Sequence, residues 1–256
     1  FTYASESLKE STKYAITTPA DRKKISPSLS LSYRLLPDDA LFFRTMVKST
    51  FRLPTFNDLY YLQIGNTSLR PENAVEYGAG LTWNSRKIGA VKYVTATVDA
   101  YINNVTDKIV AFPSTYIWKM VNFGKVKAKG LDLTLGTQID LSKGFSLTAS
   151  GAMTLQEAKD KTENSPTYNS QLPYTPKVSG SLSAIFYTPW INIGYSSTAQ
   201  GKRYSMAQNT NEYLMKSYME HSLSVSRLFH ISKSNDLTLQ LTVNNITNKQ
   251  YEIIKY

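Results

Sequence analysis

The sequence contains no cysteine, which excludes disulfide bonds and thiolate metal sites. It has two histidines, His221 and His230, and neither has a second histidine at metal-ligand spacing. Glu220 is adjacent to His221, but neighbouring residues of a strand point to opposite faces, so His221 has no evident partner. The sequence therefore predicts no catalytic residues and no metal site.

Long hydrophobic runs are also absent. No apolar stretch approaches the roughly 18 residues of a membrane-spanning helix, and the mean hydropathy is −0.31. Strands of a membrane barrel carry a weaker signal, because about ten residues alternate between the two faces. The 18 tyrosines favour β structure and interfacial aromatic girdles.

The formal net charge of the chain is +10, which raises the question of nucleic-acid binding. The basic residues are dispersed, as in Arg44 with Lys48, Lys125 with Lys127 and Lys129, and Lys202 with Arg203. No basic helix, zinc-finger spacing or aromatic RNA-binding signature accompanies them. We therefore predict no nucleic-acid partner and attribute the cations to the attraction of anions.

Alternating apolar and polar residues predict an all-β protein of about ten antiparallel strands. Short turns, at 37–40, 140–144, 188–189 and 230–236, alternate with long loops. Residues 1–24 have loop composition, and loops are also expected at 53–71, 113–119, 157–176 and 207–211. The polar faces are poor in large apolar residues, whereas a soluble sandwich fills its core from both sheets. The strands are expected at 25–35, 41–52, 75–84, 94–103, 131–139, 145–156, 178–186, 191–195, 223–229 and 237–244.

One stretch carries a family resemblance. Residues 51–61 read FRLPTFNDLYY and are followed by Gly65-Asn66, by Leu69-Arg70-Pro71-Glu72 and by Glu76-Tyr77. This pattern resembles the C-terminal barrel of TonB-dependent outer-membrane receptors. Residues 243–252 (VNNITNKQYE) resemble the "NLxDKxY" element before the final strand of such receptors. The resemblance covers most of the chain, with Pro54, Asn57, Asp58 and Pro71 as loop-shaping residues.

The resemblance implies a transmembrane antiparallel β-barrel that crosses the bacterial outer membrane many times. Residues 1–256 are expected to be the C-terminal portion of the barrel, with about ten of 22 strands. The plug, the N-terminal strands and the final strand are expected to lie outside this chain. No resident cofactor and no enzyme activity are implied.

The resemblance also implies partners. They are TonB, through the missing N-terminal plug region, a large nutrient ligand, lipopolysaccharide and outer-membrane lipid. Whether a surface-exposed substrate-binding lipoprotein covers the barrel stays open.

Two sets of residues are candidates for the site. Arg44, Lys48 and Arg52 project from one strand face toward the lumen; either they pair with plug carboxylates or with Glu76, or they form a basic rung for an anionic solute. Tyr116, Trp118, Arg203 and Tyr204 place aromatic rings beside cations at extracellular height. They belong either to the outer aromatic girdle or to a substrate-binding surface.

The predicted function is TonB-dependent uptake of a large scarce nutrient. The ending Tyr251–Tyr256 resembles vitamin B12 (cobalamin) receptors of the Bacteroides type, so cobalamin is the leading ligand, followed by haem and ferric siderophores. A passive porin of the same architecture is the first alternative. An outer-membrane enzyme is the second, and it needs a nucleophile or base at the rim that the sequence does not supply.

Overall fold

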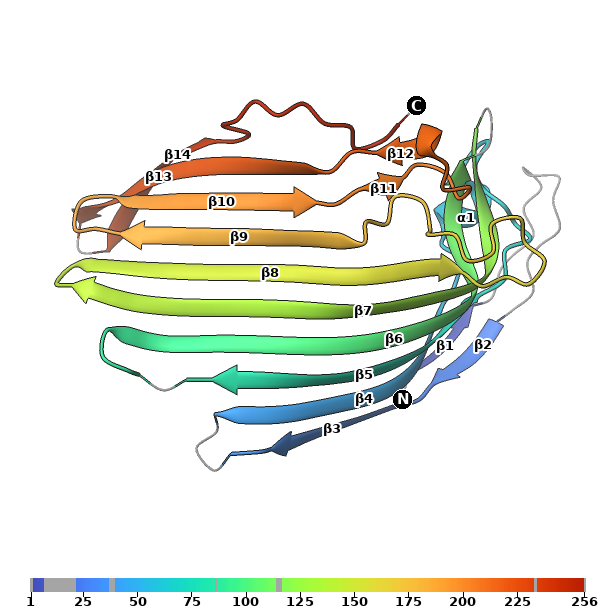
Figure 1. The fold of residues 1–256 in the computed structure, drawn as a ribbon, viewed down its shortest axis with the longest axis horizontal. Helices are drawn as coiled ribbons and strands as arrows, with labels where there is room; N and C mark the ends of the chain where they lie inside the picture. Colours follow the sequence, from blue (N-terminus) through green and yellow to red (C-terminus); the bar gives the residue numbers. More distant parts are fainter. Residues whose placement is uncertain are drawn as a thin grey trace.

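A computed structural model describes residues 2–6, 22–36, 40–85, 87–113, 117–232 and 234–255. An antiparallel sheet of ten strands dominates this part of the chain (Figure 1). Its strands lie side by side in chain order, which confirms the predicted fold class. From one edge to the other they are β3 (Ser28–Arg34), β4 (Leu41–Arg52), β5 (Glu72–Asn84), β6 (Val91–Pro113), β7 (Trp118–Ser142), β8 (Phe145–Asp160), β9 (Val178–Tyr187), β10 (Asn192–Gln200), β13 (Tyr218–Ser232) and β14 (Asn235–Val243).

Smaller elements lie at the end of the sheet that carries the long connections. β1 (Thr2–Glu6) pairs with β2 (Arg22–Ser26), and β11 (Arg203–Tyr204) pairs with β12 (Leu214–Met215). The two short helices are α1 (Phe56–Tyr60) and η1 (Asn211–Tyr213). Among the residues placed by the structure, no helix has both the length and the apolar character needed to cross a membrane, a finding that does not bear on β-barrels.

Two loop predictions need correction. Residues 2–6 and 22–24 form strands rather than loop, because backbone pairing overrides their polar composition. β6 and β7 continue well beyond the expected 94–103 and 131–139, since their outer halves also pair in register. The predicted turn at 37–40 lies largely outside the described residues, because positions 37–39 are not among them.

The pairing register sorts the side chains into a polar face and an apolar face. One row across nine strands consists of Ser32, Arg44, Gly80, Asp99, Asp132, Thr154, Ser179, Gln200 and Tyr218. The adjacent row on the other face consists of Tyr33, Phe43, Leu81, Val98, Leu133, Met153, Gly180, Ala199 and Met219. A period of two residues thus separates polarity across the whole sheet.

No second layer covers the apolar face in the described part of the chain. Leu135, Leu182 and Leu241 keep 54%, 49% and 71% of their surface exposed. An apolar area this extended marks an interaction surface, for a protein partner or for a membrane. The sheet therefore has the two-sided polarity expected of a barrel wall.

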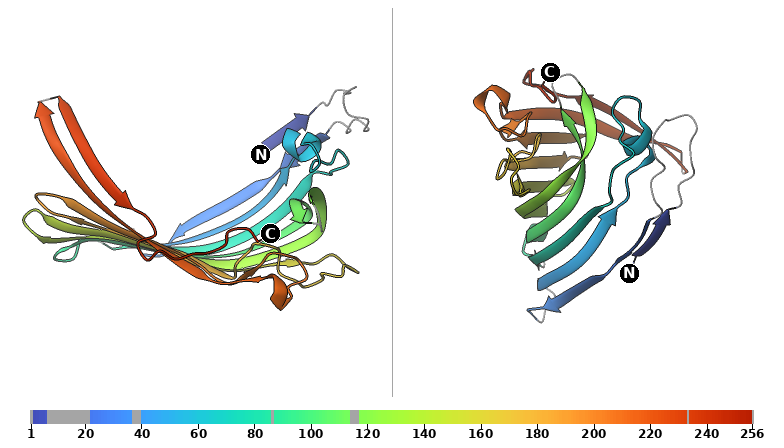
Figure 2. Two further views of the ribbon diagram at one scale, coloured as in Figure 1. Left: turned by 90° about the horizontal axis from the view of Figure 1, so that it is seen from above. Right: turned by 90° about the vertical axis from the view of Figure 1, so that its right-hand side faces the viewer.

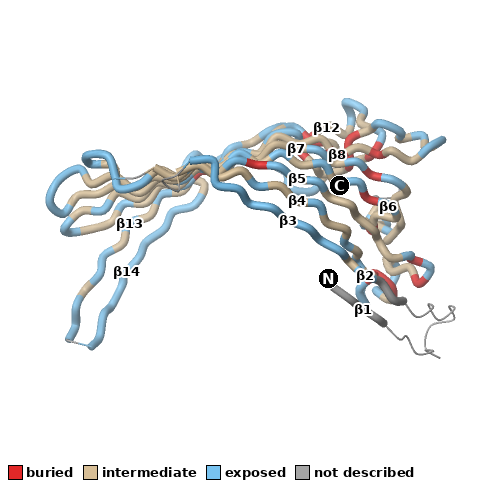
Figure 3. Tube along the Cα trace, turned by 90° about the horizontal axis from the view of Figure 1, so that it is seen from below, coloured by how far each residue is buried: buried red, intermediate tan, exposed pale blue. Residues whose placement is uncertain are grey.

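The buried residues gather at the end of the sheet where α1 and the long connections lie (Figure 3). The sheet is curved, and α1 lies on its concave side (Figure 2). There Leu59 and Leu69 pack on Ile109 of β6. In a second cluster, Leu172 from the β8–β9 connection packs on Val105 and Val126. Because Val105 and Ile109 belong to the polar face, the connections fold over that face and cover one end of it.

Candidate ligand-binding site

The three predicted basic residues of β4 lie on the polar face, and each is paired with a carboxylate. Arg44 donates to both oxygens of Asp99, at 2.8 and 3.0 Å. Lys48 Nζ lies 3.1 Å from Glu76. The predicted pairing with Glu76 is therefore confirmed for Lys48, whereas the partner of Arg44 was not foreseen.

Arg52 anchors the connection between β4 and β5. Its guanidinium donates to Asp58 at 2.7 Å and lies 3.7 Å from Glu72. The Thr55 hydroxyl accepts from the Asp58 backbone, and the Asp58 carboxylate accepts from the Thr55 backbone, so the two residues form a capping box that starts α1. The loop-shaping role predicted for Asp58 is confirmed.

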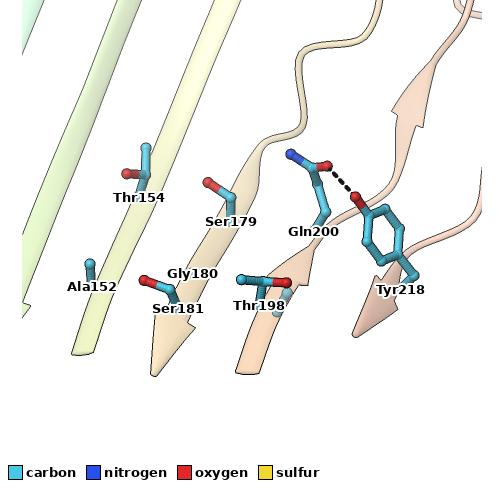
Figure 4. A pocket seen from close by; sticks show the side chains of 9 residues that line it. Ala152, Thr154, Ser179, Gly180, Ser181, Thr198, Gln200 and Tyr218 are labelled. Atoms are coloured by element: carbon cyan, nitrogen blue, oxygen red, sulfur yellow. Dashed lines mark hydrogen bonds between the residues drawn. The ribbon is translucent and has the colours of Figure 1, made fainter. Parts of the chain in front are cut away.

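A polar hollow of about 300 Å³ opens farther along the sheet. It is lined by side chains from four neighbouring strands, β8, β9, β10 and β13 (Figure 4). The Tyr218 hydroxyl donates to the Gln200 side-chain oxygen at 2.9 Å. The other polar groups that line the hollow are the hydroxyl groups of Thr154, Ser179, Ser181 and Thr198. No charged side chain lines it.

Arg203 is buried close to Tyr218, with 3% of its surface exposed. Its guanidinium carbon lies 5.4 Å from the centroid of the Tyr218 ring, and Nη2 donates to the Glu252 carbonyl at 2.6 Å. The Tyr251 ring stacks on the Tyr218 ring, with their centroids 4.0 Å apart. Arg203 thus fixes Tyr218 and is not itself accessible to a large ligand.

Trp118 and Tyr204 meet the same residue, Tyr174. The rings of Trp118 and Tyr174 have centroids 6.0 Å apart, and the Tyr174 backbone N–H donates to the Tyr204 carbonyl at 2.7 Å. Tyr116, the fourth predicted residue, lies outside the described residues. Tyr174 therefore joins two of the predicted aromatic residues above one end of the polar face.

The sequence analysis missed Gln200, Tyr218 and Tyr174. Gln200 and Tyr218 both lie on the polar face, in strands whose polar and apolar residues alternate. Small residues weaken this alternation at 192–200, and the strand of Tyr218 begins earlier than predicted. Tyr174 lies in a loop and carries no periodic signal. Extending the register across β10 and β13 would have placed Gln200 opposite Tyr218.

The histidines have structural partners. The Tyr195 hydroxyl and His221 Nδ1 are 2.6 Å apart, so the expectation that His221 has no partner is wrong; the partner comes from the neighbouring strand. His230 Nδ1 lies 2.7 Å from Asp236 in the β13–β14 turn. Within the ranges that the structure describes, no cluster of three or more His, Asp or Glu side chains could hold a metal ion.

The family model described as "TonB dependent receptor-like, beta-barrel" matches residues 3–246. The chain belongs to this family. A curated relative, the vitamin B12 transporter BtuB of Vibrio vulnificus, is 27% identical over 106 residues, which are 41% of this chain and 16% of that protein.

Solved structures of the family share the fold. The siderophore receptor PiuA from Acinetobacter baumannii gives a TM-score of 0.69 at 18% identity, with 96% of this chain and 35% of that one covered. The ferric citrate transporter FecA gives 0.67 at 18% identity, with 92% and 35% covered. This chain thus spans about a third of the length of these two structures.

Proposed function

We propose that the chain forms part of the wall of an outer-membrane receptor that takes up a large, scarce nutrient with energy from TonB. The family assignment and the two-sided polarity of the sheet support this proposal. The exposed apolar face suits outer-membrane lipid, and the concave polar face suits a wet lumen. By this proposal the plug and the segment that contacts TonB belong to parts of the protein outside residues 1–256.

The charge of the polar face is the observation that carries the choice of ligand. Arg44, Lys48 and Arg52 are paired with carboxylates, so they offer little attraction to an anion. The hollow beside Gln200 and Tyr218 presents hydroxyl and amide groups instead. Such a surface fits a large ligand with many amide groups, and cobalamin is the leading candidate. Haem and ferric siderophores, which commonly carry negative charge, rank behind it.

Binding to purified full-length receptor tests this proposal. Equilibrium titrations with cobalamin, haem and a ferric siderophore should give the tightest binding for cobalamin. Replacing Gln200 by Leu together with Tyr218 by Phe removes hydrogen-bonding groups while it preserves most of the volume. We expect at least a tenfold loss of affinity, about 1.4 kcal/mol.

The control is Gln240→Leu, because Gln240 also lies on the polar face but is paired with Ser226, well along β13 from Tyr218, and does not line the hollow. Equal affinity of the parent and the double variant would remove the hollow from the site. Uptake by cells that continues without TonB would instead indicate a passive porin. A surface lipoprotein that covers the barrel would appear as a co-purifying partner whose loss lowers the uptake rate.

A further inference from the structure

Five lysines stand together on the apolar face, at the loop end of β7 and β8. Along β7, outward positions change abruptly from Lys125, Lys127 and Lys129 to Leu131 and Leu133. Along β8 and just beyond it, Lys161 and Lys159 are followed by Glu157, and then by Leu155 and Met153. The lysine cluster, defined as Lys125, Lys127, Lys129, Lys159 and Lys161, therefore begins where the apolar stripe ends.

The pairing register places like charges opposite each other in this cluster. Lys127 is paired with Lys159 across β7 and β8, and the Lys161 backbone donates to the Lys125 carbonyl. Like charges on directly opposed residues destabilise a strand pair. A sheet that carries this arrangement gains stability when an anion lies between the ammonium groups.

The carboxylates nearby neutralise only part of the charge. Glu157 is shared between Lys129 at 3.3 Å and Lys159 at 3.2 Å, and Glu163 pairs with Lys125 at 2.9 Å. Lys127 has no ion pair with any residue that the structure places, and Lys161 bonds only the neutral Asn169 and stands over the Tyr168 ring. Four of the five lysines, all except Lys125, line a hollow of about 180 Å³ together with Glu157.

We propose that the lysine cluster binds the phosphorylated headgroup of an outer-leaflet lipid whose acyl chains lie on the adjoining apolar stripe. This inference rests on the proposed membrane location. Ammonium groups form charge-assisted hydrogen bonds with phosphate oxygens, and lysines near an anionic lipid surface are attracted to it. A lipid fits better than free phosphate, because the headgroup and its chains meet a charged and an apolar surface at the same time.

The test uses full-length receptor purified in detergent and transferred to bilayer discs that contain the phosphorylated glycolipid of the outer leaflet. The triple variant Lys127→Gln, Lys159→Gln and Lys161→Gln removes three ammonium groups and leaves Lys125 paired with Glu163 and Lys129 paired with Glu157. Native mass spectrometry counts the lipids that remain bound. We expect the triple variant to retain at least tenfold less lipid than the parent.

Two controls separate charge from location and from folding. Lys87→Gln, Lys92→Gln and Lys143→Gln remove the same charge near the short turns at the other end of the sheet, and this variant should retain lipid like the parent. Lys127→Gln alone disturbs no ion pair among the described residues, so it should fold normally and still lower lipid retention several-fold.

Two further measurements identify the anion that the lysine cluster binds. The same lipid without its phosphate groups should bind to the parent as weakly as the intact lipid binds to the triple variant, and inorganic phosphate should compete only at far higher concentration. Equal lipid retention by parent and triple variant, or equal affinity for inorganic phosphate and lipid, would overturn the proposal. Nutrient binding is measured in parallel. A parent receptor that binds none of the nutrients would contradict the proposed function, but it would leave the conclusion about lipid binding unchanged.

Discussion

Arg44 of β4 and Asp99 of β6 form an ion pair across the strand between them, directly over Gly80 of β5. Arg44 and Asp99 each face Gly80 in the register, and both carboxylate oxygens accept from the guanidinium. A Cβ atom at position 80 would stand 2.0 Å from Asp99 Oδ1. The pair therefore depends on the missing side chain of the glycine.

Replacing Gly80 by Ala should separate Arg44 from Asp99. We expect a loss of about 1–3 kcal/mol in the free energy of unfolding, as for other overpacked sites, measured by denaturant titration of the full-length receptor. Gly136→Ala is the matched control, because a Cβ there meets no atom within 4 Å. Arg44→Met should cost at most about 1 kcal/mol in the parent, as expected for an exposed pair, and nothing in the Gly80→Ala background.

The two faces of β14 should tolerate charge differently. Leu241 lies opposite Val225 on the apolar face, and Thr242 lies opposite Ser224 on the polar face. Leu241→Arg should cost about 2–4 kcal/mol near the bilayer midplane and less toward its edges, whereas Thr242→Lys should be nearly neutral. Reversible unfolding in lipid vesicles measures both. Equal costs on the two faces would argue against lipid contact.

The strands were predictable because polarity alternates within each of them, and this signal needs no neighbour. The extension of β6 and β7 was not predictable from the sequence. Residues such as Lys119 and Lys125 are paired through the backbone with Phe112 and Thr106, and their side chains carry no apolar alternation. Pairing partners far apart in the sequence decided those strand ends.

Tagging should reveal which end of the sheet faces the cell exterior. We expect a short epitope inserted after Asn164, in the connection between β8 and β9, to be detected on intact cells. A tag after Lys143, in the β7–β8 turn, should be detected only after the outer membrane is opened. Surface labelling at Lys143 and not at Asn164 would reverse the orientation.

Alkaline pH should release the segment that contains Tyr251. The hydrogen bond to Glu220, then burial and the charge of Glu220, raise the pKa of Tyr251 above its ordinary value of 10.0. A raised pKa favours the neutral phenol, so the contact is fully present below about pH 10 and is lost as the pH rises through the higher folded value. Tyrosinate absorbance should show this late-titrating group, and Tyr251→Phe should remove it. Tyr168→Phe is the control, and an unchanged titration in Tyr251→Phe would contradict the assignment.

The site was less predictable than the fold. The sequence correctly placed Arg203 beside aromatic rings. The exposure of the Arg203 side chain, however, depends on which other segments fold over it. Glu252 lies far from Arg203 along the chain, and Tyr218 lies on another strand. Both residues contact the guanidinium. The neutral polar hollow arises from single residues of four strands, so no local motif marks it.

The β6–β7 hairpin is far longer than a membrane crossing requires. Its strands contain 23 and 25 residues, or roughly 80 Å at about 3.3 Å per residue, whereas a crossing uses about 9–11 residues. In the proposed orientation about half of the hairpin extends beyond the membrane on the outer side of the cell. There Phe112 and Phe123 pack together across the two strands. Antibodies and bacteriophages could reach this part of the hairpin from outside the cell, so changes in its outward side chains should alter recognition by such agents while the uptake of nutrient continues.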